Sequence, residues 1–249
     1  MKRYDLHTHT TMSDGSVTPE ALLAAAKQKG YGLGITDHAF CCNMYTLDDV
    51  SRYLERLRPL EVMRGLEGNM GEDYSLPGSL DRQVDYVIAS VHSMPGPRRE
   101  RYQLGDYFCY VSGLSSEESI SYSEALFDDY AACTLKMVED TFRTQRADIY
   151  GHPLVVPFYS KRKGTLAAEA FENAVVSLCQ KYHVALEISG LWDASTPRMI
   201  RRAKAAGVRF TLGSDCHLAK DACNLDRAIA LADACGLTED DFFLPKRNG

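Results

Sequence analysis

The 249-residue sequence has no apolar run of the ~20 residues that a membrane-spanning helix needs. Its N-terminus leads from Met1 directly into a polar motif, so we expect no signal peptide. It has no excess of basic residues either, because 28 Lys and Arg stand against 34 Asp and Glu, a formal net charge of −6. This balance argues against a general nucleic-acid-binding surface but not against a local basic patch. The lack of an apolar span argues against a membrane partner.

The eight cysteines include no Cys-x-x-Cys pair. A chain of this length, 45% hydrophobic, can bury a full core without a disulfide framework. We therefore expect reduced thiols, a cytoplasmic protein and one domain over residues 1–249.

Histidine is distributed unevenly. Six of the seven histidines stand at the end of a short apolar, β-prone run, and they are His7, His9, His38, His92, His152 and His217. Only His183, within Lys181–Val184, looks like an ordinary surface or core histidine. Scattered structural histidines would not concentrate at strand ends in this way.

Carboxylates accompany these histidines. Asp14 follows the His7-x-His9 pair, Glu67 ends the apolar run 62–67, and Asp215 precedes His217. In an extended segment His7 and His9 share one face, so their imidazoles converge. Imidazoles and carboxylates that converge on one point are suitable ligands for a divalent transition metal.

Strands alternate with helices along the chain. We expect strands at about 3–9, 32–36, 61–67, 85–91, 148–152, 184–188 and 208–212. We expect helices at about 19–29, 47–58, 117–146 (in two pieces), 165–182, 197–206 and 224–235, and irregular structure at 93–116. This alternation predicts an α/β fold with a parallel sheet. Because every candidate ligand follows a strand, a closed barrel is favoured, since only closure brings the first and last strands together.

Seven motifs occur in order over residues 4–217: His7-x-His9, Asp14-Gly15, Thr36-Asp37-His38, Gly65-x-Glu67, Ser90-Val91-His92, Gly151-His152-Pro153 and Gly213-Ser214-Asp215-x-His217. Together they resemble the PHP (polymerase and histidinol phosphatase) family of metal-dependent phosphoesterases. The resemblance implies a distorted seven-stranded (β/α)7 barrel related to the TIM barrel.

Nine candidate ligands fit two to three divalent ions, such as zinc, manganese or iron, in a di- or trinuclear site, and the resemblance implies three. In that arrangement one ion takes His7, His9, Glu67 and Asp215. A second shares Glu67 and adds His92 and His152. A third takes Asp14, His38 and His217. Cys216 lies between two of these ligands, so its side chain is expected to point away from them.

The charge of such a site indicates its substrate. Three divalent ions, three carboxylates and a bridging hydroxide leave about +2, which suits a phosphate monoester dianion. The hydroxide would attack phosphorus while Glu67 bridges two ions. The general acid for the leaving oxygen stays open between Asp215, His217 and a metal-bound water.

Basic residues near the strand ends are candidates for phosphate binding. They are Arg98, Lys161 and Arg162. Asp37 is expected to be structural because it points away from the ligands. Glu187 could orient a ligand, contact the substrate or form a hydrogen bond at the barrel mouth. Trp192 could line the pocket or pack against its neighbours.

The substrate is a small phosphate monoester in our first hypothesis, with L-histidinol phosphate as the best single guess. Asp14 stands where many histidinol phosphatases of this family carry histidine, which weakens that narrow assignment. A phosphodiesterase or exonuclease acting on nucleotides or short oligonucleotides is the alternative. A catalytically silent regulatory module would be expected to lose ligands, and none is missing here.

Overall fold

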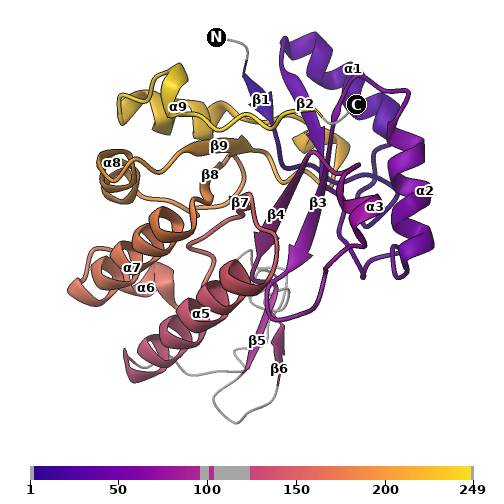
Figure 1. The fold of residues 1–249 in the computed structure, drawn as a ribbon. Coiled ribbons are helices and arrows are strands. Elements are labelled where there is room, and N and C mark those ends of the chain that lie inside the picture. Colours follow the sequence, from indigo (N-terminus) through magenta and orange to yellow (C-terminus); the bar gives the residue numbers. More distant parts are fainter. Residues whose placement is uncertain (1–2, 96–100, 104–123, 248–249) are drawn as a thin grey trace.

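The structure is a computed structural model that describes residues 3–95, 101–103 and 124–247. Its centre is a seven-stranded parallel sheet in the order β1-β2-β3-β4-β7-β8-β9 (Figure 1). These strands are Tyr4–Asp5, Gly32–Ile35, Met63–Asn69, Tyr86–Ser90, Ile149–Tyr150, Ala185–Ser189 and Phe210–Gly213. Two further strands, β5 (Ser93–Pro95) and β6 (Arg101–Gln103), form a separate antiparallel pair.

The first and last strands of the sheet are neighbours. The Leu6 amide donates to the Leu212 carbonyl at 2.9 Å, and the Asp215 amide donates to the His7 carbonyl at 2.8 Å. Thr8 and Cys216 form a further parallel bridge. The sheet therefore curls into a nearly closed barrel, as predicted, and the carboxyl ends of its strands meet at one rim.

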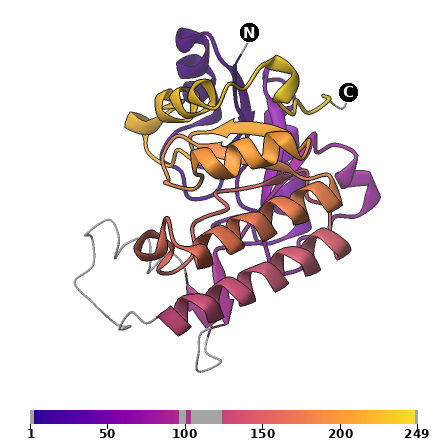
Figure 2. The same ribbon diagram turned by 90° about the vertical axis from the view of Figure 1, so that its left-hand side faces the viewer.

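Helices surround this barrel. They are α1 (Pro19–Lys29), α2 (Leu47–Leu57), α3 (Gly78–Asp81), α5 (Glu124–Thr144), α6 (Tyr159–Arg162), α7 (Leu166–Tyr182), α8 (Pro197–Ala205) and α9 (Asp226–Ala234), with 3-10 turns at Ala219–Asp221 and Glu239–Asp241. Figures 1 and 2 show α1 and α2 on one side and α5, α7, α8 and α9 stacked in chain order on the other. Contacts between successive members hold this stack together.

The main helices begin and end where local chemistry predicts. Thr18 accepts a hydrogen bond from the Ala21 amide at 3.3 Å and caps α1. Gly30 ends the same helix with φ 72°, a left-handed conformation that glycine adopts without steric cost. Thr46 and Asp49 form a capping box at the start of α2.

Some elements differ from the sequence-based expectation. The first strand is shorter than the predicted 3–9 and covers only Tyr4–Asp5. Beyond Asp5 the backbone also forms hydrogen bonds with β9 and the segment after it, at Leu212 and Asp215. The described part of 117–146 is one continuous helix, and 117–123 lie outside the described residues. The antiparallel pair β5–β6 lies in the stretch 93–116 that was expected to be irregular, of which 96–100 and 104–116 lie outside the described residues. Helices α3 and α6 have four residues each, too few to produce a periodic pattern.

The interior of the barrel below the rim is filled by a small cluster of side chains, namely Leu6, Tyr86, Ile88, Ile149 and Ala185. The Tyr86 hydroxyl donates to the Leu6 carbonyl at 2.7 Å, next to His7. The barrel is thus packed by side chains at this level and is not an open pore.

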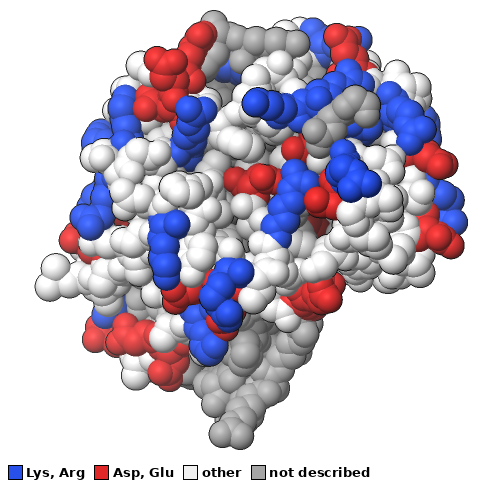
Figure 3. Space-filling view, in the orientation of Figure 1, with Lys and Arg blue, Asp and Glu red and all other residues white. Residues whose placement is uncertain are grey.

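The surface is polar and mixed in charge. On the face shown in Figure 3, Lys and Arg side chains are interspersed with Asp and Glu. Within the described residues, no helix is both long and apolar enough to span a bilayer.

Candidate metal centre

The rim of the barrel gathers all nine predicted ligands. They come from the segment after β1 (His7, His9 and Asp14), from after β2 (His38), from β3 (Glu67), from after β4 (His92), from after β7 (His152) and from after β9 (Asp215 and His217). Because parallel strands end on the same side of the barrel, residues more than 200 positions apart meet here.

Glu67 lies at the centre of the cluster and is 1% exposed. Three imidazole nitrogens lie within 3.4 Å of its Oε1 atom, namely Nε2 of His7, His92 and His152. Its Oε2 atom faces His38 Nδ1 at 3.0 Å and His9 Nε2 at 3.4 Å. One carboxylate therefore touches two separate groups of imidazoles, which is the geometry that a shared ligand requires.

Asp215 is the second buried carboxylate. Its Oδ1 atom lies 3.1 Å from His9 Nε2 and 3.4 Å from His7 Nε2. The structure therefore brings together the four residues predicted to hold the first ion.

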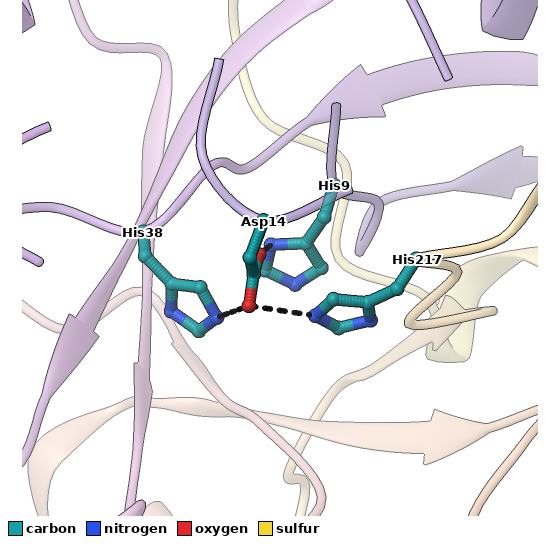
Figure 4. Close-up of side chains that lie close together, drawn as sticks. All are labelled: His9, Asp14, His38 and His217. Atoms are coloured by element: carbon teal, nitrogen blue, oxygen red, sulfur yellow. Dashed lines mark ion pairs between the residues drawn. The ribbon is translucent and has the colours of Figure 1, made fainter. Parts of the chain in front are cut away.

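Asp14 is the third carboxylate and is more exposed. Its Oδ2 atom lies 3.5 Å from His217 Nε2 and 3.6 Å from His38 Nε2, and its Oδ1 atom lies 3.8 Å from His9 Nδ1 (Figure 4). His9 is thus closer to the third predicted group than we expected, since it faces Asp14 with one nitrogen and Glu67 with the other.

Asp37 holds the loop that presents Asp14. Its carboxylate accepts hydrogen bonds from the Thr10 amide and hydroxyl, both at 2.7 Å, and from the Ser13 hydroxyl at 2.5 Å. A Cβ on Gly15 would lie 2.5 Å from the His9 carbonyl oxygen, so the loop can return this closely only with glycine. These contacts support the structural role predicted for Asp37.

Buried nitrogen and oxygen atoms at the centre lack hydrogen-bond partners among the described residues. They are His7 Nε2, His9 Nδ1 and Nε2, His38 Nδ1, and Glu67 Oε1 and Oε2. Buried polar atoms without partners are costly in free energy. Divalent cations between these atoms would satisfy them, so the donor set fits metal ions.

Three sets of ligand atoms are compact enough for an ion, each with all its atoms within 4.8 Å of one another: His9, Asp14, His38 and His217; His7, His9 and Glu67; and His38, Glu67 and His92. These sets overlap with the three predicted groups and contain no thiol. Cys216 instead belongs to the hydrophobic core, as its position in an extended segment predicted.

Neighbouring groups orient three of the imidazoles. His7 Nδ1 lies 2.9 Å from Glu187 Oε1, and His217 Nδ1 lies 3.0 Å from the Asp215 carbonyl oxygen. His92 Nδ1 bonds to Asn69 Oδ1. Because each of these oxygens can only accept a hydrogen bond, Nδ1 is the donor in each pair, and Nε2 is the ring nitrogen directed at the centre.

Glu187 uses both carboxylate oxygens in this arrangement. Its Oε2 atom accepts a hydrogen bond from the His152 amide at 2.5 Å while Oε1 faces His7. Of the three roles predicted for Glu187, these contacts with two candidate ligands support the orientation of a ligand. Asn69 escaped the sequence analysis, although it lies two positions after Glu67 on the same face of β3 and could have been found by this spacing.

Two candidate ligands have unusual backbone conformations. His152 has φ 32° and Asp215 has φ 50°, in the left-handed region that non-glycine residues seldom adopt. Such conformations cost roughly 1–3 kcal/mol each and concentrate at functional sites. Here the strained residues direct their side chains to the centre of the cluster.

The electrostatics of the cluster favour charged carboxylates. Burial opposes ionisation of Glu67, but His7, His92 and His38 outweigh it and hold its pKa well below the usual value. Burial also opposes the charged form of His217, but its contacts with Asp14 and Asp215 raise its pKa to about 9. Burial dominates for His38 and lowers its pKa to about 3.

A cavity of ≈ 670 Å³ opens above these ligands. Its lining includes six residues that are not predicted ligands, namely Phe40, Cys41, Cys42, Asn69, Glu72 and Trp192. Among the described residues that line it, none is lysine or arginine. Arg162 pairs with Glu124, Lys161 lies over the Phe158 ring, and Arg98 is outside the described residues.

A family comparison agrees with this geometry. The PHP domain model matches residues 5–190, which is most of the chain. The chain belongs to the PHP family. The resemblance read from the motifs is therefore confirmed.

Curated relatives of this PHP protein cover nearly its whole length. A protein of Shewanella oneidensis named "Probable phosphatase" is 27% identical over 95% of this chain and 84% of its own length. One of Vibrio parahaemolyticus with the same description is 28% identical over 95% of this chain and 86% of its own. Family and relatives together support a phosphatase-type hydrolase.

Solved structures confirm the barrel. A candidate histidinol phosphatase from Listeria monocytogenes aligns with a TM-score of 0.66 at 16% identity, over 88% of this chain and 97% of its own. A histidinol phosphate phosphatase from Lactococcus lactis, solved with zinc, L-histidinol and phosphate, aligns with a TM-score of 0.63 at 18% identity, over 95% of each chain. At such identities the likeness establishes the fold alone.

Proposed function

We propose that this PHP protein is a metal-dependent phosphatase that hydrolyses a small phosphate monoester. The observation that carries the proposal is the set of buried ligand atoms on His7, His9, His38 and Glu67 that lack hydrogen-bond partners among the described residues. These atoms lie directly below an open cavity, where a substrate could reach ions bound to them.

The nine gathered residues would hold two to three divalent ions, with zinc, manganese and iron as the candidates. Such ions supply a water acidified toward pKa ~7 and positive charge for the phosphate oxygens. The protein's part is to hold the ligands in place, through Glu187 and Asn69 behind the imidazoles and Asp37 behind the Asp14 loop.

Charge favours a monoester over a diester. Asp14, Glu67 and Asp215 alone would repel a phosphate, whereas with three ions and a hydroxide the site carries about +2. A monoester dianion matches that charge better than a singly charged diester. Arg98, Lys161 and Arg162 stay candidates for phosphate contacts, and Arg162 would have to exchange its Glu124 partner for the substrate.

The leaving oxygen needs a proton. Of the two ionisable candidates at the cavity, Asp215 releases its proton readily, because His7 and His9 outweigh the burial that would raise its pKa. His217 retains a proton well above neutral pH. His217 is therefore the better donor when no third ion takes its Nε2 atom.

L-Histidinol phosphate is the first substrate to test. Support comes from the Lactococcus lactis protein, which has the same barrel and was solved with L-histidinol, phosphate and zinc. We further propose that the reaction takes place in the cytoplasm and that residues 1–249 act as one domain.

The test compares p-nitrophenyl phosphate, bis-p-nitrophenyl phosphate and L-histidinol phosphate with zinc, manganese or iron. We expect higher kcat/KM for the monoesters than for the diester, and no turnover after chelation. The Arg162→Ala variant should lose about tenfold in kcat/KM or more if its guanidinium binds phosphate. A better diester substrate would favour the phosphodiesterase alternative, and no turnover of any ester would reject the proposal.

A further inference from the structure

The loop that follows β8 places Trp192 against a predicted ligand. The indole Nε1 donates a hydrogen bond to Asp215 Oδ2 at 2.5 Å, and the side chain lines the cavity above the cluster. Trp192 is the single tryptophan of the chain. Neither the metal ligands nor the proposed chemistry assigns it a role.

Because of this hydrogen bond, the two carboxylate oxygens of Asp215 have different partners. Oδ1 faces the imidazoles of His9 and His7 at 3.1 and 3.4 Å. Oδ2 is turned to the indole. A carboxylate whose outer oxygen is held by a donor presents only its inner oxygen to an ion, and its negative charge is shared with that donor.

Several contacts hold the loop in this position. The Ser189 hydroxyl oxygen accepts from the backbone amides of Leu191 and Trp192 at 3.2 and 3.0 Å. Asp193 forms ion pairs at 2.6 Å with Lys163, which follows α6, and with Arg227 on α9. The loop that carries the indole is thus attached through Asp193 to two further parts of the chain, and its position does not depend on Asp215 alone.

We propose that Trp192 is a positioning residue that commits Asp215 to binding an ion through Oδ1 only. The inference rests on the proposed metal site and deepens it. It has two consequences: loss of the indole N–H weakens ion binding at Asp215, and ion binding changes the environment of the only indole in the protein.

The first experiment measures zinc affinity by competition with a chelating dye. In Trp192→Phe the ring can still pack but no donor is left, and we expect affinity for the most tightly bound ion to fall about 10- to 100-fold. Leu191→Ala is the matched control, because Leu191 is the neighbouring side chain and is 42% exposed. Unchanged affinity in Trp192→Phe would overturn the proposal.

A second variant separates the hydrogen bond from packing. Benzothienylalanine at position 192 keeps the two-ring shape of tryptophan and replaces N–H by sulfur. We expect it to bind zinc as weakly as Trp192→Phe does. Wild-type affinity in this variant would show that only the ring's packing matters and would overturn the proposal.

The third readout is the fluorescence of Trp192 itself. Zinc added to the metal-free protein should change the emission with the same apparent affinity as the dye competition, and Asp215→Asn should weaken or abolish the change. Emission that does not respond to saturating zinc would contradict the proposal.

These measurements use no phosphate ester, so the two proposals can fail separately. A protein that binds zinc, responds as described and hydrolyses no ester disproves only the phosphatase. A wild-type phosphatase whose Trp192→Phe variant retains zinc affinity disproves only the positioning role.

Discussion

Glu187 offers the sharpest test of how the site is held. It is fully buried, its Oε2 accepts from the His152 amide at 2.5 Å, and its Oε1 faces His7 Nδ1 at 2.9 Å. The Glu187→Gln substitution keeps the shape of the side chain but leaves a single acceptor oxygen. Because a backbone amide can only donate, that oxygen must stay with His152, and the new NH₂ group must face His7.

An NH₂ group cannot accept a hydrogen bond from Nδ1–H. The imidazole of His7 must then take the other tautomer, with Nδ1 as acceptor and the proton on Nε2, the atom that faces Glu67 and Asp215. A protonated Nε2 cannot ligate an ion. Loss of an orienting partner of this kind costs about 10- to 100-fold in metal affinity, or roughly 1.4–2.7 kcal/mol.

The assay is zinc affinity by dye competition together with ions retained per chain by elemental analysis. Glu172→Gln is the control, because Glu172 is also buried but contacts Tyr159, Thr196 and Arg198 instead of a ligand. We expect a large loss of affinity in Glu187→Gln and none in Glu172→Gln. Wild-type affinity in Glu187→Gln would show that the tautomer argument is wrong.

Three further outcomes are expected. Glu67→Gln should retain less than a tenth of the activity, a loss above about 1.4 kcal/mol, in a steady-state assay with saturating metal, and higher retention would show that Glu67 is not shared between ions. Burial raises the pKa of Asp5 from 3.8 to about 6, so the folded state loses stability as pH rises through this window. The Asp5→Asn variant does not suffer that loss. In urea unfolding of the metal-free protein, its unfolding free energy relative to wild type should therefore rise by up to about 3 kcal/mol between pH 4 and 7.5. A difference between variant and wild type that does not change with pH would refute the raised pKa of Asp5. In Gly213→Ala the new Cβ would lie 2.0 Å from Glu187 Oε1, so we expect about 1–3 kcal/mol lower unfolding free energy and weaker zinc binding. Unchanged values of both quantities would show that the Cβ does not displace Glu187.

Much of the fold could be predicted from local patterns. Thr18, Thr46, Thr165 and Thr196 cap the helices that follow them, because capping depends on a few adjacent residues. The alternation of strands and helices requires a parallel sheet, and a parallel sheet places all strand ends on one side. The grouping of the nine candidate ligands at one rim follows from these two facts.

The short or isolated elements could not be predicted in this way. Helix α6 and strands β5 and β6 have too few residues to give a periodic signal. That β1 and β9 are neighbours was inferred from the positions of the ligands and from the family resemblance, since no pattern within either strand specifies its partner.

The sequence by itself thus determined which residues could serve as ligands and on which side of the sheet they lie. Only the tertiary structure decided which atom of each ligand faces the centre. His7 is oriented by Glu187, 180 positions away, and Asp215 by Trp192, 23 positions away on another loop. Periodicity sets the face of a residue within its own element, but hydrogen bonds between elements depend on how the whole barrel packs.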